Sequence, residues 1–267
     1  AVSEKRQVII RHHDDCDGYT AGIVIEKAIS SLIHDQKKHF FYSRIQSRSP
    51  YFDYIDSLRE INNYLGGYNK EPPLVILTDL GSNNQSMKAI NRLSDYGFEF
   101  IIVDHHRFDQ ENKNAAKVFL NPHEFNYGSD LNAGALATEL ALFINPTLTN
   151  IKHLPAISGY ADKSTGDEFD KYLELSGYKL DDFEKWAMVV DHETYYMKFN
   201  GRSKFFEDLL IPDENTFKII ESMYNNIQEE SKKVEIAVKK YTKIKSINDF
   251  KLLRINRQTV GDWGYAS

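Results

Sequence analysis

Short apolar segments alternate with helical segments over the first 130 residues, and this alternation constrains the fold more than any other feature. Five segments have the apolar, β-rich character of buried strands, and they are residues 7–11, 40–45, 74–79, 98–104 and 116–120. Helical patterns lie between them, for example over 19–33 and 86–93. Strands separated by helices favour a parallel sheet that helices cover on both faces. The sequence therefore predicts a doubly wound, mostly parallel α/β fold.

The strand pattern ends near residue 130, and helical patterns follow it. Apolar residues at helical spacing predict helices over 133–144, 154–160, 183–197 and 214–241, and a strand over 250–255. We therefore expect an α/β domain over 1–165, a helical region with a long connecting helix over 166–245, and the beginning of a second domain over 246–267.

The composition excludes several classes of protein. The formal net charge of −6 argues against a protein that coats duplex DNA. A single cysteine, Cys16, excludes an internal disulfide framework and a cysteine-based zinc site. No apolar run approaches the ~18 residues of a membrane-spanning helix, and the first residues lack the apolar stretch of a signal peptide. We therefore expect a cytoplasmic protein with no membrane partner.

Acidic residues and histidines follow three of the predicted strands. Asp15 and Asp17 come after the first strand, Asp79 ends the third, and Asp104 ends the fourth with His105 directly after it. One such aspartate alone is more often a helix cap or a turn former. The carboxyl ends of parallel strands meet at one edge of a sheet, however, so the three segments converge there. Carboxylates packed together repel one another unless cations hold them, and the pattern therefore predicts a metal cluster.

These residues resemble the motifs of the DHH phosphoesterase superfamily. The first three motifs match residues 15–18, 79–81 and 104–106, and the lone aspartate of the fourth motif matches Asp162. Within the superfamily, residues 11–19 are most similar to archaeal RecJ-like proteins. A lone Asp-His-His is a weak signal, but four motifs in the family's order make a specific resemblance.

The resemblance implies a pair of divalent cations bound by six residues, which are His13, Asp15, Asp17, Asp79, His105 and Asp162. Asp15 would bind one ion and Asp17 the other, and Asp79 would bridge the two. His12 remains an alternative to His13, and Arg11 stands where some relatives have a histidine ligand. Carboxylate oxygens with imidazoles and no thiolate suit Mn²⁺ or Mg²⁺ better than structural zinc.

The resemblance also implies residues that act on the substrate. His106 resembles the family residue that contacts the substrate phosphate, where an imidazolium would stabilise charge in the transition state. The alternative is that His106 merely supports His105. Asp104 would be a catalytic neighbour that orients an imidazole. Weaker candidates for phosphate contacts are Arg107, Ser129, Asn132 and Gly134, the last at a helix start.

Two further features are expected to have structural roles only. The triplet Asp191-His192-Glu193 lies inside a predicted helix, where consecutive residues face different directions and cannot converge on one ion. Cys16 lies between two implied ligands and is expected to pack in the interior.

A two-metal-dependent exonuclease on single-stranded DNA or RNA is the function that the resemblance implies, with replication or repair proteins as further partners. Alternatives are a phosphodiesterase for short oligonucleotides or cyclic dinucleotides, and a non-catalytic replication or repair scaffold. The complete ligand set argues against a scaffold. The family's second domain carries a glycine-rich, substrate-binding motif, but no glycine cluster follows residue 201. We therefore expect either a chain that is cut within that domain or a different mode of substrate binding.

Overall fold

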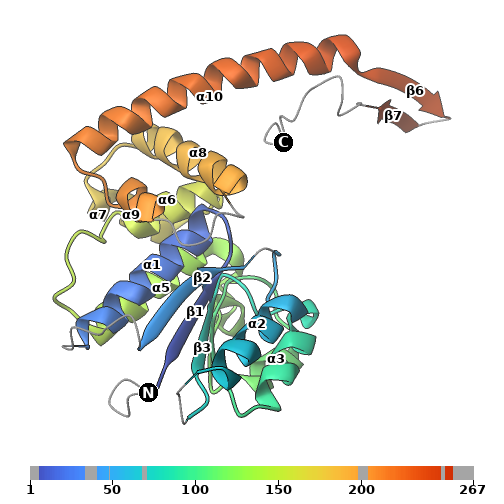
Figure 1. Ribbon diagram of the computed structural model, residues 1–267. Helices are drawn as coiled ribbons and strands as arrows, with labels where there is room; N and C mark the ends of the chain where they lie inside the picture. Colours follow the sequence, from blue (N-terminus) through green and yellow to red (C-terminus); the bar gives the residue numbers. More distant parts are fainter. Residues whose placement is uncertain are drawn as a thin grey trace. The chain divides into compact units, whose positions relative to one another are not determined.

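Five parallel strands form a sheet in the first part of the chain (Figure 1). The computed structural model describes residues 6–33, 41–47, 49–67, 71–197, 204–247 and 250–254, apart from a few side chains within these ranges. The strands are β1 (Val8–His12), β2 (Tyr42–Gln46), β3 (Leu74–Thr78), β4 (Glu99–Val103) and β5 (Val118–Leu120), and their spatial order is β2-β1-β3-β4-β5. The predicted parallel α/β sheet is confirmed.

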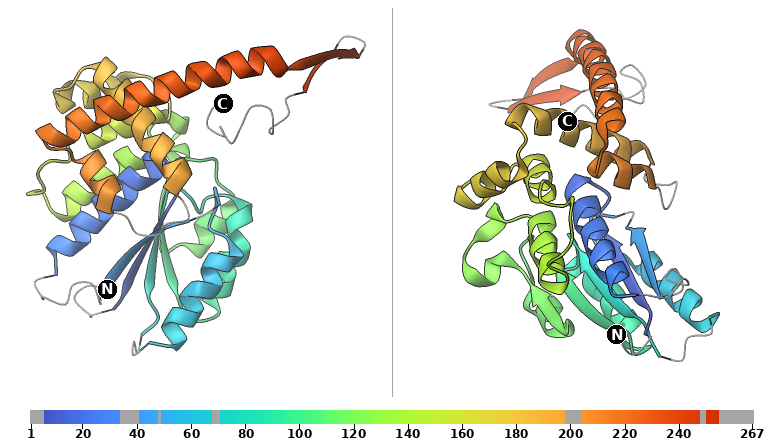
Figure 2. Two further views of the ribbon diagram at one scale, coloured as in Figure 1. Left: turned by 45° about the horizontal axis from the view of Figure 1, so that its top comes forward. Right: turned by 90° about the vertical axis from the view of Figure 1, so that its left-hand side faces the viewer.

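Helices cover both faces of the sheet, as the two views of Figure 2 show. These helices are α1 (Cys16–Ser31), α2 (Tyr54–Leu65), α3 (Met87–Ser94), α4 (Gln110–Ala115) and α5 (Ala133–Ile144). Successive side chains of β1 point to opposite faces. Val8 and Ile10 therefore pack with α1 and α5, whereas Ile9 packs with α2 and α3. The two apolar layers hold the strands in one register, so the strand ends lie along one edge.

Apolar spacing in the sequence did not predict the helix α2, because the face that α2 turns toward the sheet carries charged residues. Asp56 and Glu60, one turn apart on α2, are both buried. Arg11 of β1, which is 1% exposed, lies 3.1 Å from Asp56 (Nη1 to Oδ1) and donates from Nε to Glu60 Oε1 at 2.9 Å. Arg11 thus points into the layer between the sheet and α2. A guanidinium with two carboxylates replaces apolar residues at this core position.

Four more helices and several 3-10 turns complete the described part of the chain up to residue 213. They are α6 (Leu154–Ala161), α7 (Asp167–Ser176), α8 (Leu180–Met197) and α9 (Lys204–Leu210), with the 3-10 turns η2 (Asn84–Ser86), η3 (Pro122–Phe125) and η4 (Gly128–Asp130). The predicted helices over 154–160 and 183–197 are present as α6 and α8. The helix α8 packs against α6 and α1. The described residues divide into two compact units, one up to residue 213 and the other from residue 214 onward.

The second unit contains one long helix and a strand pair. The helix α10 spans Glu214–Tyr241, as predicted, and β6 (Lys243–Ile247) pairs antiparallel with β7 (Phe250–Arg254). The predicted domain boundaries at residues 165 and 245 stay predictions, and the end of the last predicted domain, 255–267, lies outside the described residues. Among the described helices, none is both long and apolar enough to cross a bilayer.

We expect Arg11→Met to destabilise the fold by about 3–5 kcal/mol, because it leaves the buried Glu60 carboxylate without the Arg11 charge and leaves Asp56 paired with the more exposed Arg59 at 3.5 Å. Urea denaturation of the two proteins gives this difference in the free energy of unfolding. The control is Lys27→Met, which removes an ion pair with Glu207 whose side chains are each 31% exposed, and which should cost less than about 1 kcal/mol. Equal effects of the two substitutions would contradict a structural role for the buried network.

Candidate metal centre

The loop between β1 and α1 carries the first ligands. Asp15 is the N-cap of α1, and its Oδ1 accepts a hydrogen bond from the backbone N–H of Gly18 at 2.9 Å. Gly18 approaches the preceding turn so closely that a Cβ would lie 2.4 Å from the carbonyl oxygen of His13. A side chain at position 18 would therefore push apart the loop that presents His13 and Asp15.

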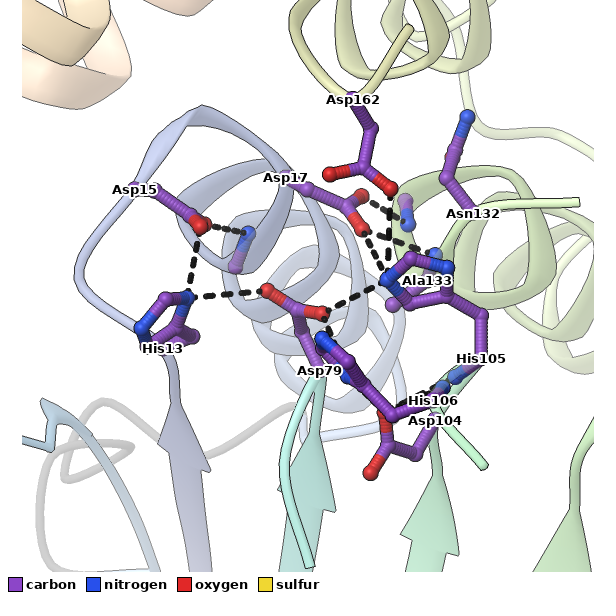
Figure 3. Close-up of polar contacts among 12 residues, drawn as sticks. His13, Asp15, Asp17, Asp79, Asp104, His105, His106, Asn132, Ala133 and Asp162 are labelled. Atoms are coloured by element: carbon purple, nitrogen blue, oxygen red, sulfur yellow. Dashed lines mark hydrogen bonds and ion pairs between the residues drawn. The ribbon is translucent and has the colours of Figure 1, made fainter. Parts of the chain in front are cut away.

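The other predicted ligands come from three more segments. Asp79 follows β3 with a φ of 58°, which is unusual for a residue other than glycine and turns the chain sharply at the strand end. His105 follows β4, and Asp162 is the C-cap of α6. Figure 3 shows these side chains pointing toward the same region as Asp15 and Asp17. The edge of the sheet thus collects all six predicted ligands.

The six residues form two groups joined by Asp79. In the first group, His13 Nδ1 lies 2.6 Å from Asp15 Oδ2 and 3.4 Å from Asp79 Oδ2. In the second group, His105 Nε2 lies 3.3 Å from Asp79 Oδ1, 3.3 Å from Asp162 Oδ2 and 3.5 Å from Asp17 Oδ2. Three sets of ligand atoms lie within 4.8 Å of one another, close enough to hold one ion, and they are those of His13, Asp15 and Asp79, those of Asp17, His105 and Asp162, and those of Asp79, His105 and His106. Asp79 therefore offers one carboxylate oxygen to each group.

Buried ligand atoms without hydrogen bonds show that the residues fit divalent cations. Both carboxylate oxygens of Asp79, both ring nitrogens of His105 and Nδ1 of His13 are buried and make no hydrogen bond of acceptable geometry. Burial opposes charge on His13 and His105, but the neighbouring carboxylates, Asp15 for His13 and Asp79 for His105, raise the two pKa values to about 12 and about 10. Cations in place of these protons would satisfy both oxygens of Asp79, Nδ1 of His13 and Nε2 of His105.

Asp17 is held by the beginning of α5. Its Oδ2 accepts a hydrogen bond from the backbone N–H of Ala133 at 2.9 Å, and its Oδ1 accepts from the N–H of Gly134 at 2.6 Å and from the hydroxyl of Ser158. A Cβ at Gly134 would lie 2.2 Å from Ser158 Oγ, so glycine permits this contact. Asn132 caps the same helix by accepting from the N–H of Ala135 at 2.7 Å.

This arrangement bears on the predicted substrate contacts. The N–H groups at the start of α5 already bind an anion, and that anion is the Asp17 carboxylate. Substrate contacts by Asn132 and Gly134 therefore stay predictions, as does that of Arg107, which is exposed. The side chain of Ser129 lies outside the described part of the structure. The sequence analysis missed Ser158, although it lies four residues before Asp162 on the same helix.

Asp104 fixes the ring of His106 and stays out of both groups. Its Oδ1 lies 2.8 Å from His106 Nδ1, and its Oδ2 accepts from the N–H of Ser82 at 3.0 Å. Burial alone would raise the pKa of Asp104, but the hydrogen bond with His106 brings it down to about 2. The same hydrogen bond raises the pKa of His106, whose side chain is 52% exposed. His106 Nδ1 also lies 3.7 Å from Asp79 Oδ1, so a ligand role is an alternative to contact with substrate.

The neighbouring His12 lies inside the fold. Its ring is buried, Nδ1 lies 2.7 Å from the carbonyl oxygen of His13, and Nε2 lies 3.2 Å from Arg44 Nη1. A Cβ at Gly22 of α1 would lie 2.6 Å from this ring. Of the two histidines that the sequence left open, the structure brings His13 to the ligand groups. Cys16 is buried, as expected.

The stability of the chain in EDTA should fall as the pH rises from 6.5 toward 10. The folded-state pKa values of His13 and His105 lie above the ordinary value of 6.5, so their stabilising effect is complete below pH 6.5 and is lost as the pH rises through the folded values. Burial raises the pKa of Asp17 as well, which acts in the same direction. Urea denaturation in EDTA at pH 6.5 and 9 measures the fall.

Saturating Mg²⁺ should counter this fall, because the ligands bind cations in their deprotonated forms and the stabilisation by metal grows with pH. The same denaturation experiment with Mg²⁺ in place of EDTA provides the comparison. A free energy of unfolding in EDTA that rises over this pH range would contradict the electrostatics of the two groups.

Comparisons with known proteins agree on the family. The model of the DHH family, N-terminal domain, matches residues 7–162. An uncharacterized protein of Methanocaldococcus jannaschii is 30% identical over 265 residues, which cover 88% of this chain and 35% of that protein. A solved DHH domain, described as belonging to a member of a family of ribosomal proteins, is 33% identical with a TM-score of 0.88, and the match covers 100% of this chain and 66% of that one.

The fold is also similar to that of RecJ. RecJ from Thermus thermophilus, solved in complex with Mn²⁺, superposes with a TM-score of 0.57 at 14% identity over 90% of this chain and 38% of that one. The chain spans about a third of the curated relative and 66% of the solved DHH-domain chain. On the family match and the geometry of its motifs, this chain belongs to the DHH family, whose members are generally phosphoesterases.

Proposed function

We propose that this chain carries the catalytic centre of a two-metal-dependent phosphodiester hydrolase, an exonuclease that acts on single-stranded nucleic acid. The observation that carries the proposal is the carboxylate of Asp79, which is 1% exposed and presents one oxygen to each of two ligand groups. A shared carboxylate between two cation sites is the arrangement of enzymes that hydrolyse phosphate esters with two metals. The likeness of the fold to RecJ supports nucleic acid as the substrate.

The residues divide the work of catalysis. His13 and Asp15 would hold one Mn²⁺ or Mg²⁺ ion, Asp17, His105 and Asp162 the other, and Asp79 both. When bound, the cations supply Lewis acidity, which lowers the pKa of water and neutralises phosphate charge. Asp104 forms a hydrogen bond with Nδ1 of the His106 ring. Nε2 of this half-exposed ring is therefore available to donate to a phosphate oxygen. This donor would strengthen as charge develops in the transition state.

A phosphodiesterase for short oligonucleotides or cyclic dinucleotides is the second candidate. The net charge of −6 provides little long-range attraction for long polyanions, which favours small substrates. Incubation with Mn²⁺ and 5′- or 3′-labelled single-stranded DNA and RNA, with products resolved by length, tests the first proposal. Dinucleotides and a cyclic dinucleotide provide the competing arm. Replication and repair proteins as partners stay a prediction.

Asp79→Ala should lower the rate of Mn²⁺-dependent hydrolysis by more than roughly 10³-fold and leave the circular-dichroism spectrum unchanged. Among the described residues, Asp79 is the one that presents oxygens to both groups, and removal of one carboxylate relieves repulsion when metal is absent. The control is Asp95→Ala, which removes an exposed aspartate at the end of α3. Substantial activity of Asp79→Ala at saturating Mn²⁺ would overturn the bridging role.

His106→Ala should bind Mn²⁺ with unchanged stoichiometry but lose roughly 10²–10³-fold in kcat, because it removes a donor to the transition state. Calorimetry and steady-state kinetics separate the two effects. Arg107→Ala, the adjacent exposed residue, should raise KM with little effect on kcat if its guanidinium only contacts substrate phosphate. Loss of one bound Mn²⁺ in His106→Ala would make His106 a metal ligand instead.

A further inference from the structure

The helix α8 makes a polar contact with the metal-binding loop that sequence patterns did not indicate. The carboxylate Oδ1 of Asp191 accepts a hydrogen bond from the backbone N–H of Cys16 at 2.8 Å, across 175 residues of sequence. Cys16 is the residue between Asp15 and Asp17. Among the described residues, Asp191 belongs to none of the groups whose ligand atoms lie close enough together to hold one ion.

We propose that Asp191 is a positioning residue of the metal centre: it fixes the peptide N–H of Cys16 and so sets the relative positions of Asp15 and Asp17. The inference rests on the proposed function, since it assigns the two aspartates to different ions. It concerns a residue outside the segment that the family model matches, which ends at residue 162.

The position of the hydrogen bond explains its effect. The first N–H groups of a helix have no partner within the helix. In α1, two of these groups donate hydrogen bonds to carboxylates. Asp15 accepts from Gly18 and Asp191 accepts from Cys16, so both ends of the peptide segment that carries the ligands are held. Without Asp191, the Asp15–Cys16 peptide could rotate, and Asp15 would move relative to Asp17.

The helix α8 is itself fixed in orientation, which makes Asp191 a rigid support. Trp186 is fully buried, donates from Nε1 to the carbonyl oxygen of Leu209 at 2.6 Å, and stacks on His153 with ring centroids 5.0 Å apart. Thr194, one turn after Asp191, is also buried. These contacts prevent α8 from rotating about its axis, so the carboxylate of Asp191 keeps its place beside α1.

A buried carboxylate beside Asp15 destabilises the fold when no cation is bound, so stability of the fold does not by itself explain Asp191. Burial and the nearby charge of Asp15 raise the pKa of Asp191 to about 7. A neutral amide would accept the same hydrogen bond without this repulsion. Cations bound by Asp15 and Asp17 would offset the repulsion, so a carboxylate can serve as the acceptor when the centre is occupied.

Titration of the purified chain with Mn²⁺ alone, followed by calorimetry, tests the proposal. Asp191→Ala should weaken Mn²⁺ binding by roughly 10–100-fold, the range typical for residues that orient metal ligands. Asp191→Asn keeps an acceptor for the Cys16 N–H and should restore most of the affinity. Glu193→Ala is the matched control, because it removes the same charge from the same helix, where Glu193 pairs with the neighbouring His192.

The outcomes separate the alternatives. Wild-type affinity in Asp191→Ala would overturn the proposal, as would equal weakening by Asp191→Asn or by Glu193→Ala. If Asp191→Ala does not fold, Asp191→Glu carries the test: it keeps the charge but displaces the acceptor oxygen by one methylene, and unchanged Mn²⁺ affinity in this variant would overturn the role. A wild-type chain that binds Mn²⁺ but cleaves no nucleic acid would refute the proposed function. The Mn²⁺ affinities of the wild type and the variants would still test the role of Asp191. No Mn²⁺ binding by the wild type would refute both.

Discussion

Repulsion among buried carboxylates is the constraint on which the rest of this structure depends. Asp79 lies between two groups of ligand atoms, and neither of its oxygens makes a hydrogen bond, although both are buried. Such an arrangement is unfavourable unless cations are bound close by. The parallel sheet makes it possible, because the strands β1, β3 and β4 end at one edge and deliver their following residues to one place.

Helix beginnings hold the ligand aspartates in position. The N–H groups of α1 bind Asp15 and Asp191, and those of α5 bind Asp17. The start of a helix carries a partial positive charge, so each of these contacts orients a carboxylate and also offsets part of its charge. Gly18 and Gly134 permit the close approach, since a Cβ at either position would meet the loop or Ser158. Helix N-termini often bind phosphate groups, and in this fold they bind the carboxylates of the metal ligands.

The helical segments after Asp162 are part of the same compact unit as the sheet. Asp162 ends α6, α8 packs against α6 and α1, and Asp191 reaches the loop between the first two ligand aspartates. The unit extends to residue 213, well beyond the segment that the family model matches. This part of the chain therefore supports the geometry of the centre as well as the packing of the fold.

Local patterns in the sequence determined the parallel sheet and the segments that carry the ligands. Alternating strands and helices leave one favoured topology, and that topology brings the strand ends together. The sequence did not reveal α2, because Asp56 and Glu60 occupy core positions that pair with Arg11. It left His12 and His13 open, since the sequence pattern does not show that the strand ends between the two residues. The tertiary structure alone decided that Asp191 meets Cys16, because a contact across 175 residues depends on how α8 packs against α1, and no periodicity along the chain encodes that packing.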